Sequence, residues 1–261
     1  MHALLFACLS FIDLSGFLIQ AQTIRNPVRD SAIIQHRQIR LVRSPSMAKQ
    51  FPNRRTAIIS YPLISGLTPR ALRRVHSLLS FKNIFDYSLA EYRNDAWLSE
   101  FTYVVNHNGH HLLDLTFTPS GMAAYPDEQS KHFLIDIRTG GIVTAEHAFQ
   151  ADKLAELAAL VDSRLQAEIE QLKKDNAASK DIDPSQQASV NDAYSVLKFE
   201  IKELNDFSVS QKGITFLYDA GFPHVIKALE PEGRYFFPYA LLKPYIKAEG
   251  PLAQFIHQGL E

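Results

Sequence analysis

The sequence predicts an α+β fold, in which a mostly antiparallel sheet is combined with a long amphipathic helix and short flanking helices. Two hairpin signals, at residues 101–118 and 207–218, lie on either side of an apolar stripe of helical period that starts at Leu154. Strands therefore come first, one long helix follows, and strands return. This order lacks the β-α-β alternation of a parallel sheet.

The first helix is predicted from Thr68 to about Leu79. Thr68 is a good N-cap residue, and Pro69 suits the first helical position because it has no N–H to leave unpaired. A short apolar segment, residues 61–67, precedes this helix.

An antiparallel meander is predicted next. Residues 101–107 (FTYVVNH) and 110–118 (HHLLDLTFT) flank Asn108-Gly109, a strong signal for a two-residue hairpin turn. A loop over residues 119–130 then leads to a third strand at 132–137. A turn at residues 138–141 precedes Ile142-Val143.

The C-terminal half is predicted to begin with a helix that ends near Lys174. Its apolar residues recur at three- and four-residue steps: Leu154, Leu157, Leu160, Val161, Leu165, Ile169 and Leu172. Residues 175–190 are polar and aperiodic, which favours a loop. A second hairpin pairs 207–209 with 214–218, residues 223–228 are a candidate strand, and Phe237-Pro238 opens a short helix that ends near Ile246.

Composition indicates a globular chain, with 46% hydrophobic and 21% charged residues and a formal net charge of −1. The charge balance argues against a dedicated nucleic-acid-binding protein. A single cysteine excludes a disulfide scaffold and any zinc site made of several cysteines.

Residues 1–21 are expected to be a signal peptide, since an apolar run ends at the small residue Ala21. This predicts a periplasmic or extracellular protein at the cell envelope. The run is too short and broken for a stable transmembrane span. Two features oppose the prediction: no Lys or Arg precedes the run, and Asp13 interrupts it. Met47 is an alternative start.

Residues 22–57 are predicted to be a basic, flexible arm, followed by one domain over residues 58–255 and a tail over 256–261. Eight basic residues and one acid lie between Gln22 and Ser60, whereas the chain from Tyr61 onward has 19 basic and 26 acidic residues. The arm is either a solvated linker or an electrostatic contact with an anionic surface.

No contiguous catalytic motif is present, and no cofactor is expected. Histidines offer the one candidate metal site. A turn at Asn108-Gly109 would place His107 and His110 opposite each other, with Asp114 on the same strand face as His110. The alternative is that these are surface histidines at a hairpin tip.

The loop over residues 120–129 (SGMAAYPDEQ) is the candidate ligand-binding segment. It is long for a hairpin connection, and long loops on a rigid scaffold often bind ligands. Met122, Tyr125, Pro126 and Asp127 are its candidate contact residues. The aromatic residues around Trp97 and Phe237 are expected to be mostly core or half-buried sheet residues.

Short motifs in matching order resemble the extracytoplasmic domain designated DUF3298, over roughly residues 58–255. The motifs are Tyr61-Pro62-x-Ile64-Ser65-Gly66-Leu67, residues 103–117, Ala123-x-Tyr125-Pro126, Phe133-x-Ile135-Asp136-x-x-Thr139-Gly140, residues 207–216 and residues 240–246. The resemblance implies an α+β domain of exported or membrane-anchored bacterial proteins. One branch is the outer part of an anti-sigma factor that binds lysozyme, and another accompanies a peptidoglycan deacetylase domain.

The chain departs from both branches, since it shows neither a clear membrane span nor the metal-binding Asp-Asp motif. The resemblance therefore implies an exported, non-catalytic binding domain that recognises a lysozyme-like protein or a cell-envelope glycan such as peptidoglycan. Two alternatives remain open: a small metal-dependent hydrolase of envelope polymers, and a structural envelope protein.

Overall fold

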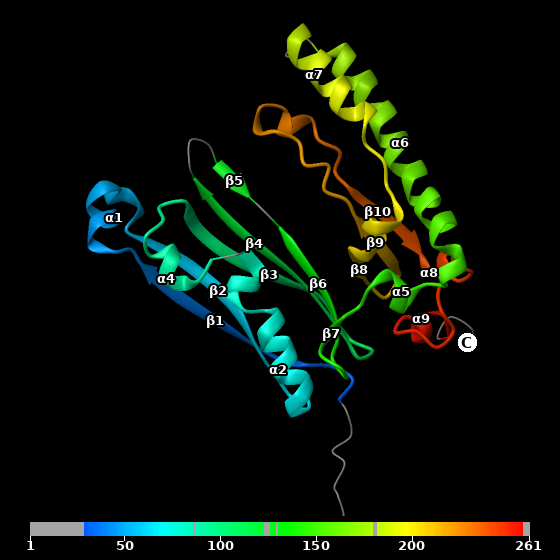
Figure 1. The fold of residues 1–261 in the computed structure, drawn as a ribbon, viewed down its shortest axis with the longest axis horizontal. Helices are drawn as coiled ribbons and strands as arrows, with labels where there is room; N and C mark the ends of the chain where they lie inside the picture. Colours follow the sequence, from blue (N-terminus) through cyan, green and yellow to red (C-terminus); the bar gives the residue numbers. More distant parts are fainter. Residues whose placement is uncertain (1–28, 86, 123–125, 129, 180–181, 258–261) are drawn as a thin grey trace, which may run out of the picture.

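The computed structural model describes residues 29–85, 87–122, 126–128, 130–179 and 182–257 (Figure 1). Two sheets with helices around them form the α+β fold that the sequence predicts. The strands are β1 (Ile33–Val42), β2 (Thr56–Ser65), β3 (Leu98–Gly109), β4 (Leu112–Met122), β5 (Pro126–Glu128), β6 (Lys131–Asp136), β7 (Gly141–Ile142), β8 (Phe207–Val209), β9 (Gly213–Leu217) and β10 (Arg234–Pro238).

Helices connect and flank these strands. The α-helices are α1 (Pro45–Gln50), α2 (Pro69–Leu78), α3 (Phe81–Phe85), α4 (Leu89–Tyr92), α5 (Ala145–Ala148), α6 (Leu154–Ala178), α7 (Pro184–Ser195), α8 (Tyr239–Leu242) and α9 (Ala253–His257); the 3-10 helices are η1 (Pro52–Arg54), η2 (Ala151–Lys153), η3 (Ile201–Asn205) and η4 (His224–Leu229). Among the described residues, none of these helices combines the length and the apolar character that crossing a bilayer requires.

The larger sheet has the order β1-β2-β3-β4-β6-β7, with β5 paired to β4. Its neighbours are antiparallel except β2 and β3, which run parallel. The described residues therefore contain one β-α-β crossover, through α2–α4, where the sequence predicted none. A parallel pair needs a connection long enough to return the chain to the same end, and the helix that begins after the Thr68 cap starts that connection.

The β3–β4 turn lies at His110-His111, two residues later than predicted. Both histidines have positive φ, 54° and 58°, as a type I′ turn requires, and Gly109 pairs with Leu112. Asn108 is held in the strand because its side-chain amide bonds to both the backbone N and O of Ala32, each at 2.9 Å. The predicted register, with His107 directly opposite His110, is therefore wrong, because His107 pairs with Asp114.

The basic segment is ordered over β1, so a flexible arm was the wrong prediction there. β1 pairs with β2 along all ten residues, from Ile33 opposite Ser65 to Val42 opposite Thr56. The predicted loop over residues 119–130 is also shorter, because β4 continues to Met122 and β5 pairs back onto it. Backbone pairing, rather than an alternating apolar pattern, defines these segments.

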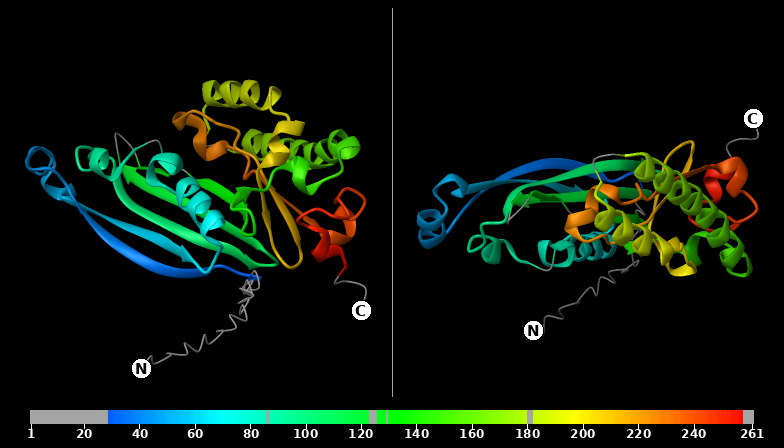
Figure 2. Two further views of the ribbon diagram at one scale, coloured as in Figure 1. Left: turned by 60° about the horizontal axis from the view of Figure 1, so that its bottom comes forward. Right: turned by 90° about the horizontal axis from the view of Figure 1, so that it is seen from above.

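The smaller sheet, β10-β9-β8, packs with α6 in the C-terminal half. Leu157, Val161 and Leu165 of α6 are buried in the same core as Phe207 and Phe216 of the sheet. This is the apolar stripe that predicted the helix. Figure 2 shows the elements from α5 to α9 gathered on one side of the molecule, with β1–β4 extending away from them.

Three predictions for the C-terminal half are wrong. Most of the predicted loop over residues 175–190 is helical, because α6 continues to Ala178 and α7 begins at Pro184 after the Asp183 cap. Residues 224–229 form η4 rather than a strand. Phe237 belongs to β10, opposite Ile214, so the short helix begins only at Tyr239.

Two cores lie on opposite faces of the larger sheet. Leu113, Leu115 and Phe117 of β4 belong to the core that includes α2 residues, whereas Leu112 of β4 and Leu134 of β6 belong to the C-terminal core. Successive strand residues point to opposite faces, so β4 and β6 supply both cores.

Candidate functional site

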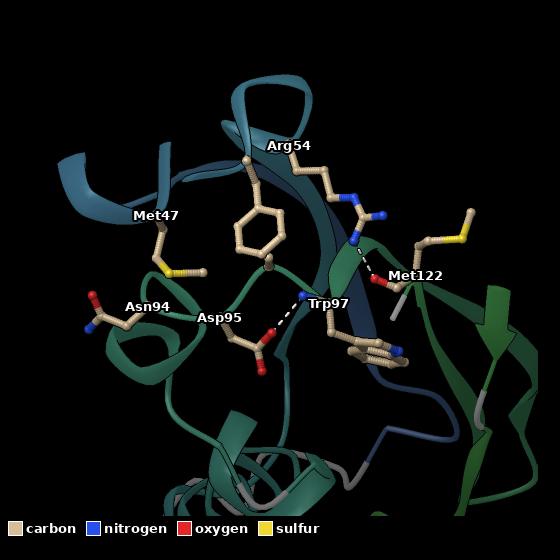
Figure 3. A pocket seen from close by; sticks show the side chains of 8 residues that line it. Met47, Arg54, Asn94, Asp95, Trp97 and Met122 are labelled. Carbon is tan, nitrogen blue, oxygen red and sulfur yellow. Dashed lines mark hydrogen bonds between the residues drawn. The ribbon is translucent and has the colours of Figure 1, made fainter. Parts of the chain in front are cut away.

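An open pocket of about 410 Å³ lies at the end of the larger sheet where β4 meets α1 (Figure 3). Its lining comes from α1 and η1, from the connection between α4 and β3, and from the end of β4. The lining residues are Met47, Phe51, Arg54, Asn94, Asp95, Ala96, Trp97 and Met122. This volume lies within the usual range for small-molecule sites.

Arg54 joins the two sides of the pocket. Its Nη1 donates to the carbonyl oxygen of Met122 at 2.5 Å, and its guanidinium lies 6.0 Å from the centre of the Phe51 ring. Figure 3 shows this hydrogen bond between η1 and the end of β4. The side chain therefore holds the pocket's walls together, and its guanidinium also lines the pocket.

The segment before β3 is held in place by one local and one long-range hydrogen bond. The carboxylate of Asp95 accepts a hydrogen bond from the backbone N of Trp97 at 2.5 Å, and the carbonyl of Trp97 accepts one from Met122 N at 2.9 Å. A Cβ at Gly121 would overlap the Trp97 carbonyl, so this close approach of β4 requires glycine. Trp97 is thereby fixed against the end of β4.

Arg43 supports the same segment from the interior. This side chain is 3% exposed and donates to the carbonyl oxygens of Tyr92 and Leu98, on either side of the pocket-lining segment. Burial lowers the pKa of Arg43, and the negative charge of Asp95 opposes that lowering. The buried cation therefore fixes two backbone positions that bracket Asn94–Trp97.

The lining residues offer two kinds of binding surface. Phe51, Trp97 and the two methionines offer aromatic and polarisable surface, while Arg54, Asn94 and Asp95 offer donors and acceptors. The aromatic rings can stack against a flat face of a ligand, and the polar side chains can form hydrogen bonds with the groups at its edge.

Of the four predicted ligand-binding residues, Met122 lines this pocket and is 37% exposed. Pro126 and Asp127 belong to β5, whose backbone pairs them with Met122 and Gly121. Tyr125 lies outside the described residues. Sequence reasoning missed Trp97 as a lining residue and placed it among core aromatics, because nothing local links it to Phe51 or Met122.

The predicted metal residues lie close together on the β3–β4 hairpin, where His107 pairs with Asp114, but their side chains make different contacts. The rings of His107 and His110 stack with centroids 5.6 Å apart, and Phe255 contacts both. Asp114 instead lies in a buried polar cluster with His132. Within the described part of the chain, no group of three or more His, Cys, Asp or Glu residues is placed to hold a metal ion.

The Asp114 cluster joins the two sheets. Asp114 is fully buried, and its Oδ2 accepts hydrogen bonds from Ser208 Oγ at 2.8 Å and Val209 N at 2.7 Å, both in β8. Its Oδ1 lies 2.8 Å from His132 Nε2 and also accepts from Asn106. Because Asp114 belongs to β4, one carboxylate connects the larger sheet to the smaller one.

His132 lies between two carboxylates. Its Nδ1 is 2.8 Å from Asp206 Oδ1, while its Nε2 faces Asp114. Burial alone lowers the pKa of His132, but hydrogen bonds to Asp114 and Asp206 outweigh that effect and raise the pKa to about 9. The imidazolium can donate from both nitrogens, so this ion-paired cluster helps to hold the larger and smaller sheets together.

Fold and pocket together define an α+β domain with an open pocket of aromatic and polar residues. The sequence matches no protein-family model and no curated protein. Among solved structures, the chain resembles a member of the DUF3298 family from Bacteroides fragilis NCTC 9343, with 13% identity and a TM-score of 0.45. That match covers 87% of this chain and 98% of the other.

A second similar structure is a DUF3298 family protein from Pseudomonas aeruginosa PAO1. It is 13% identical with a TM-score of 0.44, and the match covers 85% of this chain and 95% of that one. Both belong to the family that the sequence motifs resemble. At this identity and overlap, the likeness carries no ligand and no residue role over to this chain.

Proposed function

We propose that this chain is an exported, non-catalytic binding domain whose pocket recognises a cell-envelope glycan. The observation that carries the proposal is the lining itself, where Trp97 and Phe51 lie beside Arg54, Asn94 and Asp95. The apolar run of residues 1–21 supports export.

Aromatic rings suit the faces of sugar rings, which are apolar, while a sugar's hydroxyl and amide groups need polar partners around them. The pocket offers both kinds of surface within about 410 Å³. A site of this size fits one or two sugar residues and leaves the rest of a polymer outside. An open site at the end of a sheet is also accessible to the middle of a long chain.

The pocket is pre-organised. Arg43, Arg54 and Gly121 fix its walls through contacts that do not depend on a ligand. Binding therefore requires little ordering of the walls, which favours affinity for a small ligand.

Fluorescence provides a direct test, because Trp97 is the sole tryptophan. Soluble peptidoglycan fragments are titrated into the protein while tryptophan emission is followed. We expect a saturable change in emission and a matching calorimetric isotherm. Trp97→Ala removes the optical signal, so the affinity of this variant for the fragments is measured by calorimetry. We expect that affinity to fall at least tenfold, as for loss of an anchoring aromatic residue.

Phe236→Ala is the matched control, since Phe236 is a half-exposed aromatic residue of β10 outside the pocket lining. It should bind the fragments as the wild type does. Equal loss in both variants, or no saturable binding to the wild type, would contradict the glycan proposal. The second of these results is the one expected of a structural envelope protein.

A lysozyme-like protein is the competing ligand, because the chain from Tyr61 onward is acidic and would attract a cationic protein. Calorimetry with lysozyme at two salt concentrations separates the two. Binding that survives near-physiological salt, together with no response to glycan fragments, would replace the glycan by a protein ligand. Heat that disappears with salt would mean charge attraction only.

A further inference from the structure

β1 is the outermost strand of the larger sheet (Figure 1). It pairs with β2 on one side, and no strand in the described part of the chain pairs with its other side. Half of the N–H and C=O groups of such an edge point away from the sheet, and over ten residues they form a long template for an added strand.

The middle of β1 is open on both faces as well as along its edge. Gln35, His36, Arg37 and Gln38 are four consecutive exposed residues, although alternate residues point to opposite faces. The side chain of His36 is nevertheless held, since its Nδ1 lies 3.3 Å from the hydroxyl of Tyr103. An added strand would therefore meet an accessible surface on which at least one side chain is already held in place.

Two arginines give this edge its charge. Arg37 and Arg40 are exposed, and neither has an ion-pair partner among the residues that the structure describes. They are three positions apart, so they project from opposite faces of the strand. Their cross-strand neighbours on β2, Tyr61 and Ile58, bring no negative charge.

We infer that β1 accepts an extended acidic segment of a partner protein as an additional strand. Backbone pairing along the edge would supply the contact, and the two arginines would select acidic side chains three positions apart on that segment. A second copy of β1 is a poor occupant because it brings its own arginines to the interface, and basic side chains are a common means of preventing edge strands from self-pairing.

This site is separate from the pocket, since no residue of β1 is among the pocket's lining residues. The inference therefore stands or fails independently of the glycan proposal. It also gives a role to two of the eight basic residues between Gln22 and Ser60.

The probe is a synthetic peptide with the length of β1, made of alternating valine and threonine, with two glutamates three positions apart. We expect it to bind at moderate salt and to slow hydrogen exchange of outward-facing amides in β1. A lysine-for-glutamate peptide is the matched control and should not bind. Protection of amides elsewhere, or absence of binding, would overturn the inference.

Backbone methylation distinguishes strand addition from simple charge attraction. Successive N–H groups of a strand point to opposite edges, so N-methyl groups on every second residue block one edge of the peptide. A second peptide carries the N-methyl groups on the remaining residues, which blocks the opposite edge instead. One methylated peptide should bind and the other should not. Equal binding of both would show an electrostatic patch without strand pairing and would overturn the inference.

Charge reversal in the protein completes the test. R37E/R40E should weaken binding of the glutamate peptide by about tenfold or more and allow the lysine peptide to bind. Circular dichroism checks that the double variant is folded. If it is not, the single variants R37E and R40E are tested in its place. An unchanged preference would overturn the role of the arginines.

Two other occupants are tested in parallel. Binding of β1 to vesicles of anionic lipid, with no response to the peptide, would assign the strand to a membrane surface. Dimerisation of the chain with protected β1 amides in the absence of peptide would assign the edge to a second copy. Either result would overturn the proposed partner.

Discussion

His132 Nε2 lies 2.8 Å from Asp114 Oδ1 at the junction of the two sheets, where β6 and β4 meet β8. The imidazole is 6% exposed and the carboxylate is fully buried. A second carboxylate, Asp206, holds the other ring nitrogen. The association of the N-terminal and C-terminal halves therefore depends on a charged cluster as well as on apolar packing.

Neutralising Asp114 is expected to destabilise the fold strongly. Asp114→Asn keeps the shape of the side chain but leaves the imidazolium of His132 without its buried partner and gives Val209 N and Ser208 a weaker acceptor. We expect a loss of about 3–5 kcal/mol in the free energy of unfolding, as for other broken buried ion pairs. Urea denaturation measures it.

Asp206→Asn is the control for that variant. The carboxylate of Asp206 is 56% exposed, so water screens its ion pair with His132 and can replace its hydrogen bond to that ring. We expect a loss of less than about 1 kcal/mol. Equal losses in the two variants would contradict the central role of Asp114.

Stability is expected to fall as the pH rises from neutral into the alkaline range. The pKa of His132 is raised to about 9 in the folded protein, from about 6.5 in an unfolded chain. Between these values the folded state holds the proton and the unfolded state has released it. The contribution of His132 is therefore complete below pH 6.5 and is lost as the pH rises through 9.

The size of this effect is on the order of 3 kcal/mol, from the difference between the two pKa values. Denaturation at a series of pH values measures it. His132→Gln should be less stable at neutral pH and should lose most of this alkaline dependence. A wild type and variant with parallel pH profiles would contradict the prediction.

His107 should act in the opposite direction, on the acid side. Burial lowers the pKa of His107, and His110 lowers it further, while hydrogen bonding to the Gly109 carbonyl opposes both. The unfolded state therefore binds this proton more readily, and stability should fall as the pH drops below about 6.5. His107→Gln should reduce this acid sensitivity relative to the exposed-histidine control His36→Gln.

Gly121 is expected to tolerate no side chain. In Gly121→Ala the new methyl group would overlap the carbonyl of Trp97, so the end of β4 and the pocket wall must separate. We expect a loss of roughly 1–3 kcal/mol, typical of overpacking, together with a changed emission spectrum from Trp97.

Gly141→Ala is the matched control, because the nearest atom to its added Cβ is Thr139 Oγ1 at an ordinary 3.4 Å. Its stability and emission should stay close to those of the wild type. A fully stable Gly121→Ala variant with an unaltered spectrum would show that β4 is not constrained there.

The sequence by itself determined the local elements whose signals lie within a few neighbouring residues. The Thr68 cap and Pro69 start α2 as predicted, and the apolar stripe from Leu154 defines α6. The hairpin turn was misplaced by two residues because its position depends on Asn108, whose amide is engaged by Ala32, far away in the sequence.

The tertiary structure alone decided the parallel β2–β3 pair, the ordered basic strand and the pocket. Phe51, Trp97 and Met122 come from three separate segments, and they meet because Arg54, Arg43 and Gly121 make long-range contacts with backbone carbonyls or approach them closely. Asp114 was likewise a candidate metal ligand from the sequence, whereas in the structure β8 supplies hydrogen-bond donors to its carboxylate. Periodicity and capping are local, whereas backbone pairing and buried polar contacts join residues that sequence spacing does not connect.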